Sequence, residues 1–132
     1  MRARVHLICA ALAVALAAAA AVQEGHPLSG TWSGEWTRGG DARSRITIVM
    51  NWDGKEITGT INPGPDAADL RRVTVDYEKW TVRIEAERRD ASGKPLPIVA
   101  DGTLDDLGSW HRTLMGTWTE GGAKGSFKVT RD

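Results

Sequence analysis

The side chains most suited to ligand binding are six tryptophans in a chain of 132 residues. Indole rings bury a large apolar area in a core and also form flat walls in ligand pockets. Strand parity places four on apolar faces, which favours a role in the core: Trp32, Trp52, Trp80 and Trp118. Trp36 and Trp110 lie near predicted strand ends, where a pocket mouth or a partner contact is the better interpretation. Under the pocket hypothesis the predicted ligand-contacting residues are Trp32, Trp36, Trp80, Trp110 and Trp118.

Residues that could carry catalysis or hold a metal are sparse. Beyond the N-terminal apolar run the histidines are His26 and His111, and a metal site needs several converging ligands. Glu85 and Glu87 share the polar face of one predicted strand. The chain has no Gly-x-Ser-x-Gly, no phosphate-binding loop and no His-Glu-x-x-His. We therefore expect a non-enzymatic protein with no catalytic residue, no metal and no cofactor.

The first 22 residues have the layout of a secretory signal peptide. Two arginines precede an apolar, alanine-rich run that ends in small residues before Gln23. An uncleaved membrane anchor is the alternative, but this run is barely long or apolar enough to span a bilayer. Cleavage would remove Cys9, the only cysteine, and leave a mature domain without disulfides or thiolate ligands. We expect a secreted protein, periplasmic or extracellular in a bacterium.

The charge of the chain is balanced, with 17 basic and 17 acidic residues. The short basic pairs 71–72 and 88–89 are flanked by acidic residues, so they are interpreted as solvated charges rather than as a basic patch. We expect no nucleic-acid partner, because such binding needs a clustered basic surface.

Alternating apolar residues between turn signals predict an almost entirely β domain over residues 29–132, after a flexible tail at 23–28. About eight short strands are predicted, at 29–36, 45–52, 55–61, 73–77, 81–87, 96–104, 112–119 and 125–131. Asp53-Gly54 predicts a tight hairpin between the second and third. Residues 66–70 are predicted to form a single helical turn or a loop. Glycines within the strands, such as Gly59 and Gly116, predict bends that help a sheet to close.

The predicted fold is an antiparallel up-and-down barrel, with a β-sandwich as the alternative. Strands of about seven residues, with charged side chains such as Arg83 and Lys128 on the face opposite the apolar one, do not suit a transmembrane barrel. We therefore expect a soluble mature domain that does not insert into a membrane.

The start of the mature chain resembles the Gly-x-Trp signature of the calycins, the lipocalin- and avidin-like barrels. Gly30 and Trp32 match that signature, and the resemblance implies that Arg131, on the last strand, packs over Trp32. The whole chain is also similar to small, uncharacterised bacterial secreted proteins with a Gly-Thr-Trp start and an Asn-Pro-Gly-Pro loop. The chain is shorter than typical lipocalins, has no lipocalin helix after the barrel and does not match avidin's biotin-contacting residues. The resemblance therefore implies a fold and no ligand.

Three functional hypotheses follow. The first is a non-enzymatic binding barrel that takes a small apolar or aromatic ligand at one open end. The second is a structural or protein-interaction module whose lumen is filled by its own side chains, since a small barrel is just wide enough for that. The third and weakest is a small barrel enzyme. A cavity of about 300 Å³ or more would favour the first hypothesis over the second.

Overall fold

A computed structural model describes residues 25–38, 40 and 42–132. The predicted signal peptide at 1–22, with Cys9, lies outside the described residues. In the described part of the chain, no helix has the length and apolar character needed to cross a membrane.

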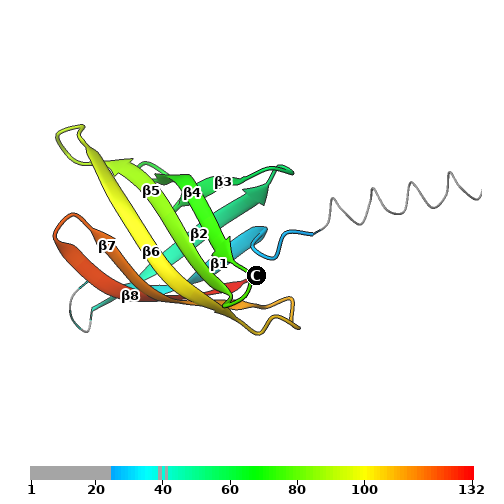
Figure 1. Cartoon of the computed structure of the whole chain (residues 1–132). Helices are drawn as coiled ribbons and strands as arrows, with labels where there is room; N and C mark the ends of the chain where they lie inside the picture. The colour runs from blue at the N-terminus through cyan, green and yellow to red at the C-terminus, as the bar shows by residue number, and fades with distance from the viewer. Residues whose placement is uncertain (1–24, 39, 41) are drawn as a thin grey trace, which may run out of the picture.

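Eight antiparallel strands close into one barrel (Figure 1). Each strand pairs with its neighbours in sequence, and β1 also pairs with β8, so the sheet has no free edge. The strands are β1 (Gly30–Thr37), β2 (Arg43–Trp52), β3 (Ile57–Ile61), β4 (Ala68–Asp76), β5 (Thr81–Arg89), β6 (Pro95–Asp105), β7 (Thr113–Glu120) and β8 (Ala123–Arg131). The predicted up-and-down barrel is confirmed, and the alternative sandwich is wrong.

Alternation of apolar and polar residues explains why these strands form a barrel. On β5, Val82, Ile84 and Ala86 are buried in the lumen, while the residues between them are more exposed. The same period holds on β2 and β6, and the antiparallel register brings inward residues opposite one another, as with Trp32 and Ile48. The lumen between the strands is therefore filled by a continuous apolar core.

The strand β4 is longer than the sequence predicted. It begins at Ala68, so the predicted helical turn or loop at 66–70 is wrong for its last three residues. The register with β5 shifts between Leu70 and Arg72, which is a bulge. Because a bulge adds one residue, Ala68 and Leu70 point inward before it, and Val73 and Val75 are the partly buried core residues after it. Because the inward positions change from even to odd numbers at the bulge, the alternating pattern indicates only the second half of the strand.

Gly116 on β7 allows an unusually close approach of two strands. It pairs with Gly102 on β6, and a Cβ at Gly116 would lie 2.6 Å from the Gly102 Cα and overlap the carbonyl oxygen of Asp101. We predict that Gly116→Ala lowers the free energy of unfolding by about 1–3 kcal/mol, because both strands must shift. The control is Gly122→Ala in the β7–β8 turn, where a Cβ meets nothing within 4 Å. Urea unfolding of both variants is the measurement, and equal stabilities would contradict this packing.

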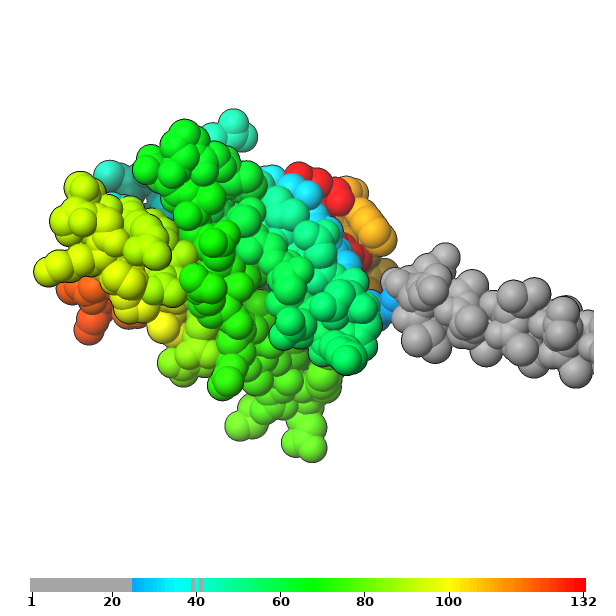
Figure 2. Space-filling view, turned by 90° about the horizontal axis from the view of Figure 1, so that it is seen from above, coloured from blue at the N-terminus to red at the C-terminus, as the bar shows by residue number. Residues whose placement is uncertain are grey.

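The two ends of the barrel differ. One end, which we call the mouth, is formed by the β3–β4, β5–β6 and β7–β8 loops and the end of β1. The other, which we call the base, carries residues 25–29, the β2–β3, β4–β5 and β6–β7 connections and the C-terminus. Figure 1 shows the β5–β6 and β7–β8 loops on the left and the C-terminus toward the right. In the space-filling view the β5–β6 loop (yellow) lies far from the first described residues (blue), so the ends are well separated (Figure 2).

Candidate functional site

The base is closed by an arginine and two tryptophans. Trp32 is fully buried and donates its Nε1–H to the Leu28 carbonyl at 2.8 Å. The guanidinium of Arg131 lies 6.0 Å from the Trp32 ring and 4.0 Å from the Trp110 ring. It also donates to the carbonyls of Trp110, Pro27 and Ser29. These contacts hold the start of the described chain across the base and use Nε and Nη1 of Arg131.

Residues 26–28, part of the predicted flexible tail, pack on the base. Leu28 is fully buried, and the imidazole of His26 lies 4.7 Å from the Trp52 ring. The His26 Nδ1 accepts from the Leu28 amide at 3.1 Å, which leaves Nε2–H to donate to the Tyr77 hydroxyl at 3.2 Å. Burial lowers the pKa of His26. The segment is thus held by a neutral imidazole.

We predict an acid-sensitive component of stability from His26. Because its pKa is lower in the folded protein, the unfolded chain binds a proton more readily, and stability falls as pH drops through the ordinary histidine range near about 6.5. Urea unfolding between pH 7.5 and 5.5 measures this decline, which His26→Gln is expected to reduce. An unchanged pH dependence in the variant would contradict the assignment.

The mouth holds a cavity with a volume of about 660 Å³. Its apolar lining includes Trp36, Ile61, Ala68 and Ile98, which belong to four different strands. The β3–β4 loop of Asn62, two prolines and Gly64 forms one rim, and the end of β5 with the β5–β6 turn forms another. The cavity thus has an apolar floor and a largely polar rim.

The five tryptophans predicted to contact a ligand do not converge on one site. Trp36 lines the mouth cavity, and the buried Trp118 stacks on it with ring centroids 4.7 Å apart. Trp32 and Trp110 lie at the base, Trp32 buried and Trp110 exposed. Trp80, in the β4–β5 turn, is partly buried against the core. Only Trp36 and Trp118 belong to the region of the cavity.

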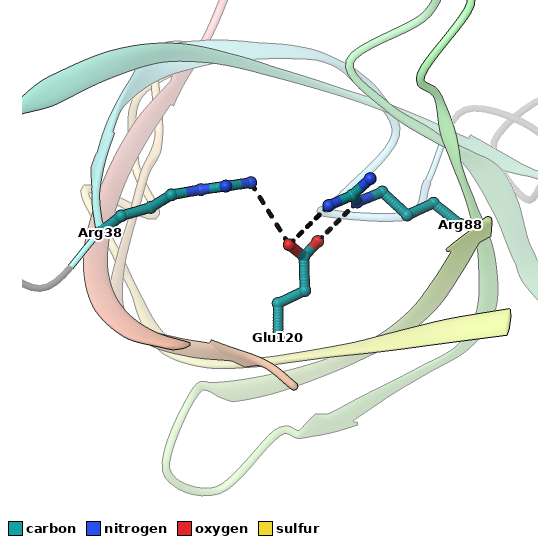
Figure 3. A network of polar contacts seen from close by, with 3 residues as sticks. All are labelled: Arg38, Arg88 and Glu120. Carbon is teal, nitrogen blue, oxygen red and sulfur yellow. Dashed lines mark hydrogen bonds and ion pairs between the residues drawn. The ribbon is translucent and has the colours of Figure 1, made fainter. Parts of the chain in front are cut away.

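A buried carboxylate lies between two arginines at the mouth (Figure 3). Glu120, at the end of β7, is only 6% exposed. Arg88, from β5, donates to both of its oxygens at 2.8 Å, and Arg38, just after β1, donates to Oε1 at 3.3 Å. Figure 3 shows Arg38 and Arg88 on opposite sides of the barrel, with both side chains directed toward Glu120. The hydrogen bonds from Arg88, with the positive charges of Arg88 and Arg38, lower the pKa of Glu120.

The Arg38 guanidinium also covers the tryptophan pair. It lies 5.5 Å from the Trp36 ring centroid and 5.8 Å from that of Trp118, within the range of cation–π attraction. The Trp118 Nε1–H is buried and has no acceptor among the described residues. A mouth cluster results, which we define as Trp36, Arg38, Arg88, Trp118 and Glu120.

The sequence predicted neither the arginines nor Glu120 as site residues. A signal was present: Glu120 continues the inward parity of Leu114 and Trp118 on β7, and Arg88 continues that of Ala86 on β5. The predicted strand at 112–119 stops one residue short of Glu120, which is the last residue of β7. A charged residue at an inward position is the observation that would have indicated a buried ion pair.

The carboxylate of the mouth cluster is not placed to act as a general base. Both Glu120 oxygens accept hydrogen bonds from arginines, and its lowered pKa keeps the carboxylate ionised, which makes it a weak base. Across the described ranges, no group of three or more His, Cys, Asp or Glu side chains is close enough to hold a metal ion. Comparison of the sequence with protein-family models and with curated proteins finds no match.

Proposed function

We propose that this protein is a secreted, non-enzymatic binding barrel that takes a small ligand with an apolar or aromatic body into the mouth cavity. The observation that carries the proposal is the cavity of about 660 Å³. Small-molecule sites have volumes of about 300–1,000 Å³, with an apolar lining and a few placed polar groups. The floor formed by Trp36, Ile61 and Ile98, with Arg38 and Arg88 at its edge, has this character.

A structural or protein-interaction module is the second candidate. It is favoured by the lumen below the cavity, where Trp32, Ile48, Met50, Ile84 and Leu114 are fully buried among one another's side chains. A ligand would therefore lie at the mouth and not deep in the barrel. The two candidates differ in whether the mouth cavity takes up small molecules.

Tryptophan fluorescence distinguishes these candidates. Titration of the mature domain with a panel of small aromatic and apolar compounds, neutral and charged, should change the emission of Trp36 and Trp118 at the mouth. Trp36→Phe should remove a large part of the response. The matched control is Trp110→Phe, which replaces the exposed tryptophan at the base. This variant should retain the fluorescence response to the ligand. A flat response across the panel would contradict the binding function and favour the interaction module.

A further inference from the structure

Two arginine side chains at the mouth keep donors that have no acceptor among the described residues. Glu120 already accepts three hydrogen bonds. Arg88 uses Nε and Nη2 for that carboxylate, and Arg38 uses Nη2, so among the described residues Nη1 of each has no acceptor. These two Nη1 groups are therefore the donors that a ligand in the cavity could use.

The two arginines are also accessible from the cavity. Their side chains are 52% exposed for Arg38 and 25% for Arg88, and both line the cavity, so a ligand there can reach both guanidinium groups. Glu120 and the tryptophan pair hold these groups in place before a ligand arrives, which lowers the cost of ordering them on binding. At the base, by contrast, Arg131 is committed to backbone carbonyls.

Carboxylates on the rim limit the charge that the cavity accepts. Asp66 and Asp90 line the cavity together with Arg89. Asp90 Oδ1 accepts from Ser92 and Lys94 in its own turn, so this carboxylate stays ionised at the rim. A ligand with several negative charges would meet more repulsion from these carboxylates than a ligand with a single negative charge placed at the arginines.

We infer that the ligand is an organic monoanion, whose acidic group binds Arg38 and Arg88 while its apolar body lies on the floor of the cavity. This inference rests on the proposed function and names the chemical class of its ligand. Glu120 already lies between the two guanidinium groups, so a ligand carboxylate would accept from the remaining Nη1 groups of Arg38 and Arg88. Such charge-assisted hydrogen bonds are about twice as strong as neutral ones. The apolar floor of Trp36, Ile61 and Ile98 accommodates the remainder of the molecule.

Calorimetric titration with 1-naphthoate and 1-naphthamide tests the inference, because the two probes share a ring system and differ in charge. We expect the naphthoate to bind about tenfold or more tightly than the amide. Arg38→Gln should reduce this difference, because only Arg88 remains to bind the acidic group, and should weaken the naphthoate more than the amide. Arg38→Lys should keep more of the difference than Arg38→Gln. The matched control is Arg83→Gln, which makes the same charge change on the outer wall beside Asp101. This variant should keep the full difference in affinity between the two probes.

The outcomes separate the two proposals. If the amide binds as tightly as the naphthoate, or if Arg38→Gln weakens both probes equally, the anion inference is wrong and the binding function stands. If neither probe binds, and the fluorescence panel is flat as well, both proposals are wrong.

Discussion

Trp32→Ala is expected to lower the free energy of unfolding by about 3–5 kcal/mol, the range for removing a large buried aromatic side chain. Trp32 is fully buried at the base, and its loss also leaves the Leu28 carbonyl without its donor and Arg131 without one of its two rings. Urea unfolding followed by circular dichroism measures the change. If the alanine variant does not fold, Trp32→Phe provides a milder change whose stability can still be measured.

Trp110→Ala is the matched control for Trp32. Its side chain also lies against Arg131, but it is 63% exposed, so we expect a loss of about 1 kcal/mol or less. Equal losses in the two variants would contradict the assignment of Trp32 to the core and of Trp110 to the surface of the base.

The second large effect is expected for Glu120→Gln. The variant leaves Arg38 and Arg88 facing each other across the mouth without a negative charge between them, and we predict a loss of about 1–3 kcal/mol at neutral pH. The expected loss of stability is moderate because both arginine side chains are partly exposed to solvent. Glu87→Gln is the matched control, since Glu87 pairs with the exposed Arg71 on the outer wall, and such surface pairs contribute about 0–1 kcal/mol.

The pH dependence gives this prediction a second measurement. The pKa of Glu120 is lower in the folded protein than in the unfolded chain, so its contribution is fully present above the ordinary glutamate pKa. The contribution is lost as pH falls from that value through the lower folded pKa. Wild-type protein should therefore lose stability over this acidic interval, and Glu120→Gln should lose less. Parallel curves for the two proteins would show that the ion pair contributes nothing.

The barrel could be predicted because the sequence patterns that indicate its strands and turns are local. Alternation on β2 and β5, and the Asp53-Gly54 turn between β2 and β3, each depend on a few consecutive residues. A hairpin turn follows Trp52 as predicted, but its loop spans residues 53–56 and is not the predicted tight turn, so β3 begins at Ile57, two residues later than predicted. The bulge in β4 was not predictable in the same way, because it depends on pairing with β5 and changes parity within the strand.

Strand parity marks Arg88 and Glu120 as inward charges, but their pairing in the mouth cluster could not be predicted because it depends on barrel closure. Arg38, Arg88 and Glu120 are 32 or more residues apart in the sequence and meet only when β1, β5 and β7 surround one lumen. Singly, each resembles an ordinary charged residue at a strand end. Tryptophan content indicated an aromatic site, but only Trp36 and Trp118 lie at the cavity region, since Trp32 and Trp110 belong to the base.

The location of a bound ligand tests the central claim most directly. Amide chemical-shift changes of the ¹⁵N-labelled mature domain during titration with 1-naphthoate should be largest at the cavity floor, at Ile61, Ala68 and Ile98. The base, including Leu28 and Trp110, should remain unchanged. Changes confined to the base, or to the outer wall around the exposed Met115, would contradict a ligand site at the mouth.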